Sequence, residues 1–276
     1  MKRMLKKIMV GAVATLSLFA FAACGNNNDT DYTPVTDDNY NVEDTTTDPV
    51  EVTSERTTLR MATSADFPPF EFIGANGEYD GFDIHMAHAL AEILGYELLI
   101  TNMNFDGVIA SVVTGASDIA VAALSITEER LLSVAFTDPY FETSLVAIVQ
   151  YDSDIVELEQ LEYATIAVQL GTTSDIMLDW FLPYADVRQF RNAPDTVLAL
   201  TSGQADAIVI DRSVADQFIN DVDGLRILEQ VLAVEEYAIA VNINDTELVA
   251  RLNDALAELV ASGEMQRIYD MFFGGE

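Results

Sequence analysis

The sequence predicts an α/β protein whose folded part, from residue 58 onward, is divided into two lobes. Strand-like and helix-like segments alternate through residues 58–144, as they do when helices pack on a largely parallel sheet. An acidic stretch at residues 152–162 interrupts this alternation, and a second series of strands and helices follows it. Half of the chain's residues are apolar, so two cores of ordinary size can be buried.

The first half of the folded part is expected to begin with a strand at Leu59–Ala62. A turn follows at the two prolines after Phe67, because proline has no NH to donate to a sheet. The Asn-Gly pair at residues 76–77 predicts a hairpin turn, and Asp83 is expected to cap a helix that runs to about residue 94. The other expected elements of this half are strands at 96–101 and 119–124 and a helix at 105–113.

The second half shows the same alternation. Its expected elements are strands at 165–168, 207–210 and 237–241, a further segment at 227–232, and helices at 174–182, 195–201, 248–262 and 263–273. Extended segments near 145–150 and 233–238 are expected to cross between the lobes. The first lobe would then comprise residues 58–144 plus 239–276, and the second lobe residues 145–238.

Residues 1–23 have the pattern of a secretory signal, with a basic start and an apolar stretch that is short for a membrane span. Cys24, the single cysteine, follows a segment that resembles a lipobox, which implies that Cys24 carries a lipid and becomes the new N-terminus. The alternative is a chance cysteine after an uncleaved anchor. Residues 24–57 are rich in Asn, Asp, Thr and Pro and predict a disordered tether. We therefore expect a secreted protein, anchored by lipid at the outer face of the cytoplasmic membrane or in the periplasm.

The chain carries 46 acidic residues against 13 Lys and Arg residues, a formal net charge of −33. Such a surface repels phosphate groups, so neither nucleic acids nor anionic lipid head groups are expected as partners. The acids are scattered along the chain and indicate no particular reaction. We expect a monomer.

Arg130 is the first candidate for ligand binding. It falls in the first turn of a short helix that Thr127 is expected to cap, where the helix dipole disfavours a cation by about 0.3–1 kcal/mol. A bound anion would explain this arginine, because a guanidinium holds a carboxylate through two parallel hydrogen bonds and Ser125 would add a hydroxyl donor. The alternative is that Arg130 pairs with a surface acid such as Glu128 or Glu129.

Residues 169–173 form a second candidate anion site. The backbone NH groups at the start of the following helix lack helical partners, and Thr172 and Thr173 add hydroxyls. The loop lacks the lysine and the spacing of a P-loop, so no nucleotide is expected. Asp211 ends a buried strand and is expected to be a helix N-cap, a ligand group or both.

Two further groups of residues give weaker evidence for a binding site. Phe67 and Phe105 lie just past expected strands, where open parallel sheets place ligands, although ordinary core packing is the alternative. His85, His88 and Glu92 have helical spacing, but they do not form a known zinc-binding pattern, so no metal site and no cofactor are expected.

Five motifs carry a resemblance to a known family. Residues 123–130 with 136–140 resemble the central signature of bacterial extracellular solute-binding proteins of family 3, which serve polar-amino-acid ABC transporters. The other four motifs are Phe67–Phe72, Gly81–Ile84, Val168–Thr173 and Ala205–Ala207. The resemblance covers residues 59–273, and five motifs in register make it specific. It implies a two-lobe periplasmic-binding-protein-like fold of type II with two crossover hinge segments.

The resemblance also implies a ligand site between the lobes. Its residues would be Ser64, Phe67, Phe105, Ala123, Leu124, Ser125, Arg130, Gln169, Thr172, Thr173 and Asp211. In this arrangement Arg130 and the hydroxyls would hold the ligand's carboxylate, Asp211 would meet its ammonium group, and the two phenylalanines would pack on its aliphatic part.

The function implied is the extracellular amino-acid-binding component of an ABC importer, which delivers its ligand to a membrane permease and is not an enzyme. Two alternatives remain. Periplasmic dehydratases acting on arogenate or prephenate share the fold, and Glu71 would be the candidate acid here. A ligand-sensing domain of a signalling protein is the other.

The side chain of the ligand is expected to be polar and uncharged. Relatives that bind cationic side chains commonly carry an aspartate at the position of Ser64. Without that acid, a buried cationic side chain would lack a partner, which would cost roughly several kcal/mol. Asp66 and Glu71 lie close in sequence and could substitute for the missing acid.

Overall fold

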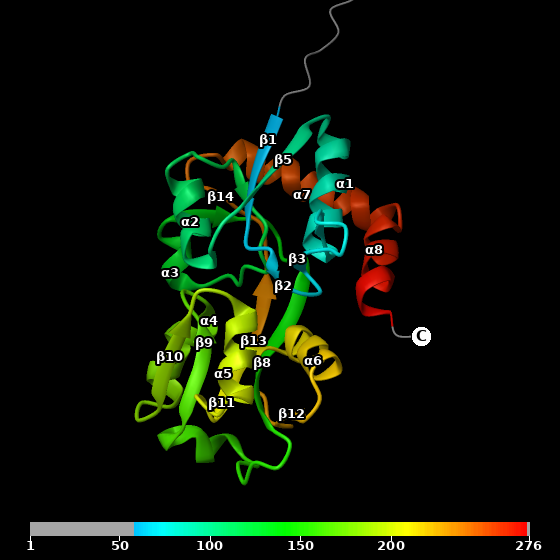
Figure 1. The fold of residues 1–276 in the computed structure, drawn as a ribbon. Coiled ribbons are helices and arrows are strands. Elements are labelled where there is room, and N and C mark those ends of the chain that lie inside the picture. Colours follow the sequence, from blue (N-terminus) through cyan, green and yellow to red (C-terminus); the bar gives the residue numbers. More distant parts are fainter. Residues whose placement is uncertain (1–57, 275–276) are drawn as a thin grey trace, which may run out of the picture. The chain divides into compact units, whose positions relative to one another are not determined.

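The computed structural model describes residues 58–274 (Figure 1). The expected signal at 1–23, the lipidated Cys24 and the tether at 24–57 therefore lie outside the described residues. Within residues 58–274, no helix is both long and apolar enough to span a membrane. Both large sheets of the structure belong to one compact unit of the chain.

The first large sheet has five strands in the order β5-β1-β6-β14-β7. Its strands are β1 Thr58–Thr63, β5 Glu97–Asn102, β6 Ile119–Ala120, β7 Val134–Phe136 and β14 Ala240–Asn242. β1 runs parallel to β5 and β6, whereas β14 is antiparallel to β6 and β7. The helices of this lobe are α1 Phe82–Leu94, α2 Phe105–Val113, α3 Glu128–Leu131, α7 Thr246–Ala261 and α8 Glu264–Phe273.

Alternation along the strands places different helices on the two faces of this sheet. Met61 and Ile119 share a core with α1 and α7, whereas Ala62 and Ala120 pack with Val108 of α2 on the other face. Because β1, β5 and β6 run parallel, their carboxyl ends lie at the same edge of the sheet. The loops that lead to Phe67, Phe105 and Ser125 leave from this edge.

The second large sheet has the order β10-β9-β11-β8-β12, with β13 paired to β8. Its strands are β8 Phe141–Gln150, β9 Thr165–Gln169, β10 Asp186–Phe190, β11 Ala207–Asp211, β12 Leu225–Ile227 and β13 Ala233–Tyr237. Its helices are α4 Thr173–Phe181, α5 Ala193–Thr201, α6 Arg212–Asp221 and a 3-10 helix at Leu158–Tyr163. A small third sheet joins β2 Asp66–Phe67, β3 Glu71–Ile73 and β4 Tyr79–Asp80.

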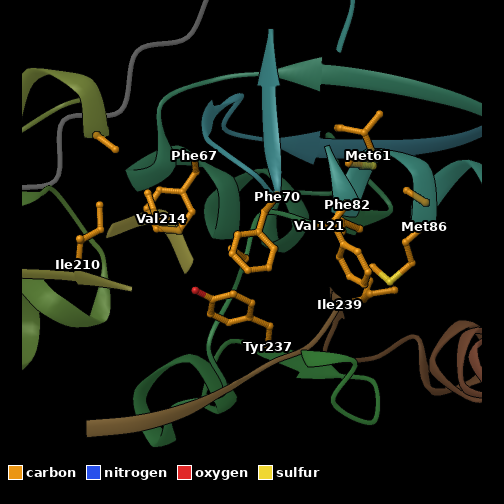
Figure 2. Close-up of a cluster of buried hydrophobic side chains, with 14 of the residues drawn as sticks. Met61, Phe67, Phe70, Phe82, Met86, Val121, Ile210, Val214, Tyr237 and Ile239 are labelled. Atoms are coloured by element: carbon orange, nitrogen blue, oxygen red, sulfur yellow. The ribbon is translucent and has the colours of Figure 1, made fainter. Parts of the chain in front are cut away.

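β8 and β13 connect the two large sheets. They pair antiparallel from Phe141–Tyr237 to Leu145–Ala233, after which β8 continues into the second sheet. Aromatic rings pack around this pair: Phe70 lies 5.1 Å from Tyr237 and 4.9 Å from Phe141 between ring centroids. Figure 2 shows Phe70 between Phe67 and Phe82, next to Tyr237. We keep the expected lobe boundaries, 58–144 plus 239–276 and 145–238, as a proposal.

Several expectations about single elements are wrong. The strand expected at 119–124 ends at Ala120, because the chain bends at Ala123, whose φ is 45°. Asp83 does not cap α1. Gly81 occupies the N-cap with φ 120°, and Asp83 lies buried in the first turn.

Other elements also differ from expectation. The segment expected at 227–232 is a strand at 225–227, and the strand expected at 237–241 is divided between β13 and β14. α6 was expected only as the helix that Asp211 would cap, and the strands β7 and β10 were not expected. Their sequences are short or mixed in polarity, and pairing with distant strands decides their conformation.

Candidate functional site

Eight of the eleven expected ligand-binding residues line one small cavity between the lobes. They are Phe67, Phe105, Ala123, Ser125, Arg130, Thr172, Thr173 and Asp211. The cavity measures about 10 Å³, roughly the room for a single water molecule. In this conformation the cavity is too small to hold an amino acid.

Arg130 lies in α3, which Thr127 caps by accepting a hydrogen bond from the backbone NH of Arg130. Its guanidinium donates to the carbonyl of Ser125 at 2.8 Å and, across the cleft, to the carbonyl of Gly171 at 3.2 Å. It also lies 5.5 Å from the centre of the Phe105 ring. Among residues 58–274, no carboxylate lies within 4.0 Å of it to form an ion pair.

These contacts argue against the surface-pairing alternative for Arg130. The side chain is only 8% exposed, and burial lowers the pKa of Arg130 while the charges of Glu235 and Asp211 oppose that change. A guanidinium has five NH donors, and two carbonyls engage two of them. The remaining donors are suited to a ligand carboxylate.

Asp211 stands on the opposite wall, at the end of β11 and at the N-cap position of α6. Its side chain makes no capping hydrogen bond, and its Oδ1 is buried without a partner among the described residues. Burial, with a smaller contribution from the charge of Glu235, raises the pKa of Asp211 to about 7, although the nearby hydroxyl of Tyr237 and the charge of Arg130 oppose the rise. A cationic group in the cavity would satisfy this carboxylate.

The hydroxyls around the cavity are already engaged. Ser125 and Thr173 both donate to Oε2 of Glu235, at 2.6 and 2.8 Å, and Thr172 donates to the carbonyl of Gln169 at 2.7 Å. Each hydroxyl has one hydrogen, so these groups present lone pairs to the cavity rather than donors. The expected hydroxyl donation from Ser125 to a carboxylate therefore does not occur in this arrangement.

Glu235 was not among the expected residues. It is 9% exposed and lies in β13, one of the two connecting strands. The alternation of strand residues contains a signal for it, because Glu235 and the buried Tyr237 are two positions apart and must face the same side. An acid that faces inward from a crossover strand is a candidate site residue.

Three expected residues do not line the cavity. Ser64 is 1% exposed and donates to Asp66 at 3.1 Å, and Gln169 donates to the same aspartate at 3.2 Å. Leu124 is fully buried and packs with Val108 in the core beside α2. Ser64 and Gln169 thus contact Asp66, which does not line the cavity either.

A larger groove of about 880 Å³ adjoins the cavity at Thr173 and Glu235. Its lining includes Glu128, Glu129 and Glu142 but no Lys or Arg. The groove offers no cation to a carboxylate, whereas the cavity contains Arg130. The helical histidines lie elsewhere, and His85 contacts Asp80 at 2.9 Å.

The model for the bacterial extracellular solute-binding proteins of family 3 matches residues 59–275. The arginine-binding extracellular protein ArtP of Bacillus subtilis is 29% identical over 276 residues, which cover 99% of this chain and 100% of that protein. The solved structure of an ancestral arginine-binding protein bound to glutamine shares 38% identity with a TM-score of 0.77, over 80% of this chain and 99% of that one.

A third similar protein is a precursor of an enzyme. The ancestral amino acid-binding protein AncCDT-1, a precursor of cyclohexadienyl dehydratase, is 35% identical with a TM-score of 0.74, over 78% of this chain and 95% of that one. The relatives ArtP and the ancestral arginine-binding protein are binding proteins rather than enzymes. This chain belongs to the bacterial extracellular solute-binding proteins of family 3 and has their two-lobe α/β fold of the periplasmic-binding-protein type II.

Proposed function

We propose that this protein binds a free polar amino acid in the cavity between its lobes and delivers it to the permease of an ABC importer. The observation that carries the proposal is the pair of opposite charges on opposite walls. Arg130 belongs to the first lobe and Asp211 to the second, and both line the cavity. The carboxylate and ammonium of an α-amino acid complement these two charges.

Such a ligand would stabilise the closed conformation because it contacts both lobes. Binding shifts the equilibrium toward closure only by the difference in its affinity for the open and closed forms. Hinge bending at β8 and β13 is the expected motion, and the permease would recognise the closed form.

We further propose that the bound side chain is polar and uncharged. Asp211 is the single acid that lines the cavity among the described residues. The substitutes considered for the missing acid lie elsewhere: Asp66 is held by Ser64 and Gln169, and Glu71 is 0% exposed. A cationic side chain would therefore lack a carboxylate partner once Asp211 meets the ammonium group.

A thermal-shift panel of the standard amino acids, followed by calorimetry on the hits, tests both proposals. Glutamine, serine or another neutral polar amino acid should bind most tightly. Arginine or lysine binding tenfold more tightly would contradict the proposed side-chain class, and Asp66→Asn would then be the next variant. No binding by any amino acid would contradict the function.

We propose binding without chemistry. Glu71, the acid considered for a dehydratase, is fully buried and does not line the cavity. Incubation with arogenate or prephenate should give no aromatic product, as followed by absorbance. Product formed at a rate proportional to protein would favour the enzyme alternative, and a membrane-linked signalling response would favour the sensor alternative.

We also propose that the mature protein is anchored by lipid on Cys24. The support is the sequence alone, since residues 1–57 are not described. Cys24→Ser should release the protein into the medium, as measured by fractionation and mass spectrometry. Unmodified protein that stays in the membrane would contradict the proposal.

A further inference from the structure

Two acids lie fully buried behind the cavity and have no part in the proposed ligand contacts. Glu71 of β3 and Asp83 of α1 are both 0% exposed. Among residues 58–274, neither forms an ion pair with Lys, Arg or His. Burying a charge without compensation is costly, so the pair requires a physical explanation.

Asp83 directly contacts the segment Ala123–Ser125, which we call the binding loop. Its Oδ2 accepts hydrogen bonds from the backbone NH of Ala123 at 2.8 Å and from the hydroxyl of Tyr140 at 2.9 Å. Its Oδ1 and both carboxyl oxygens of Glu71 are buried without a donor among the described residues. The two residues are neighbours, because the backbone NH of Asp83 donates to the carbonyl of Phe70, next to Glu71, at 2.9 Å, and hydrogen bonding between the two carboxyl groups shifts the pKa of each. Such a contact requires a proton between them.

The hydrogen bond from the NH of Ala123 to Asp83 constrains an unusual backbone conformation at Ala123. Ala123 is the one non-glycine residue with positive φ, 45°, in the described part of the chain, and it lines the cavity two residues before Ser125. A residue with a Cβ adopts this conformation only when its surroundings enforce it. The hydrogen bond from its NH to Asp83 supplies that constraint.

We propose that Glu71 and Asp83 share one proton and form a positioning pair for the ligand site. Neutral Glu71 donates to Oδ1 of Asp83, and the Asp83 carboxylate holds the NH of Ala123 in the strained conformation that presents Ala123–Ser125 to the ligand. This inference rests on the proposed amino-acid binding and adds residues that never touch the ligand.

The charges around the pair agree with a proton on Glu71. Burial raises the pKa of Glu71 well above its usual range, and Asp83, Asp66 and Asp211 raise it further. Burial also raises the pKa of Asp83 to about 7, while its hydrogen bonds from Ala123, Tyr140 and Glu71 oppose that rise.

Tyr140 also faces the pair, and Tyr237 lies next to Tyr140, with 6.4 Å between the ring centroids. Burial raises the pKa of each well above its usual range, so both remain neutral donors. Loss of the shared proton at high pH would leave two adjacent anions in a site of low polarity. Ligand affinity should therefore fall as pH rises.

Calorimetric titration of the full chain with L-glutamine between pH 7.5 and 9 tests the pair, with L-arginine as the second probe. The titration starts above pH 7 because the pKa of Asp83 is about 7 and the pair holds a single proton only above that pH. In the parent, Kd should rise about tenfold over this range. Glu71→Gln supplies an amide NH in place of the shared proton, so its Kd should stay within about threefold of the parent at pH 7.5 and lose the pair's pH dependence. The parent and the Glu71→Gln variant both contain Asp211, so the contribution of Asp211 to the pH dependence of Kd cancels when the two profiles are compared.

Asp83→Asn should weaken binding at least about tenfold at pH 7.5, because the charged acceptor of the Ala123 NH is lost. Glu78→Gln, which removes an exposed acid of the neighbouring hairpin, is the matched control and should bind as the parent does. If Asp83→Asn does not fold, the Glu71→Gln profile decides alone. Equal pH profiles for the parent and Glu71→Gln, or parent-like binding by Asp83→Asn, would overturn the inference.

Failure of the proposed function would be recognised separately. If the parent binds neither amino acid, amide hydrogen exchange at Ala123 replaces the titration. Exchange should be slow in the parent and in Glu71→Gln and more than about tenfold faster in a folded Asp83→Asn. Equal exchange in all three proteins would contradict the positioning role.

Discussion

Two pairs of buried acids flank the candidate site, and they differ in what compensates their charge. Glu71 and Asp83 lie in the first lobe, where Asp83 accepts two hydrogen bonds and neither acid pairs with a cation of the described residues, and we propose that they hold a shared proton. Asp211 and Glu235 lie beside the cavity, within the field of Arg130. The same residue type thus serves two purposes, because its surroundings decide whether a proton or a cation neutralises it.

The difference assigns separate tasks to the two pairs. The pair beside the cavity faces the position where the ligand's ammonium would add a positive charge. The pair behind it is closed to the ligand and contacts the backbone of the binding loop. Substitutions beside the cavity should therefore change affinity most, whereas substitutions behind it should change its dependence on pH.

Arg130→Ala should give the largest effect. It removes the cation near Asp211 and Glu235 and the proposed partner of the ligand carboxylate, which together should cost about 2–5 kcal/mol of binding free energy. Arg130→Lys should recover little, because an ammonium group cannot make the two parallel hydrogen bonds of a guanidinium. Calorimetric affinities within a few-fold of the parent for either variant would refute the assignment.

Asp211→Asn should weaken ligand binding but stabilise the free protein. Loss of the charged partner of the ammonium should weaken binding by about 2 kcal/mol. The free protein should melt at a higher temperature at pH 7, because burial raises the pKa of Asp211 to about 7 and the folded state disfavours its charge. Asp216→Asn on the same helix, at a partly exposed position, is the control. A lower melting temperature for Asp211→Asn would contradict the electrostatic argument.

The free protein should become less stable as pH rises from about 4.5 through 7. The pKa values of Glu71, Asp83 and Asp211 are all raised in the folded state, so the folded protein binds more protons than the unfolded chain in this range. Each proton contributes a slope of up to about 1.4 kcal/mol per pH unit.

Glu71→Gln tests this slope by removing one of the three groups. Denaturant unfolding at several pH values should show a free energy of unfolding that depends less steeply on pH than in the parent. An unchanged slope would mean that Glu71 does not bind a proton on folding.

Gly171→Ala should have the smallest effect on affinity, about two- to fivefold. The carbonyl of Gly171 accepts from Arg130 across the cleft, and a Cβ there would lie 3.3 Å from the Cα of Asp106 in the first lobe. The residue also has φ +82°, so an alanine should reduce stability by about 1 kcal/mol.

Gly224→Ala provides the matched control for that variant. Its φ is +84°, but nothing lies within 4 Å of the added Cβ. Both variants should lose similar stability, and only Gly171→Ala should lose affinity, as measured by calorimetry. Equal affinities would show that contact at Gly171 does not limit closure.

The sequence by itself determined the α/β class and most of the cavity wall. Apolar runs and the residues that end them are local signals, so most strands and helices were found near their observed positions. Phe67, Phe105 and Asp211 were found because each follows the end of an expected strand, and Arg130 because a cation in the first turn of a helix suggests a bound anion. The ends of parallel strands meet at one edge, so residues far apart in the chain converge there.

The tertiary structure alone decided which side chains contact each other across that distance. Glu235 and Ser125 are 110 residues apart, and Asp83 and Ala123 are 40 apart, so no local pattern predicts either hydrogen bond. The bend at Ala123 shortened an apolar run that otherwise predicts a longer strand, and it turned Leu124 into the core. Burial and pKa follow from these long-range contacts, because the environment of a carboxyl group is set by neighbours that the fold brings to it.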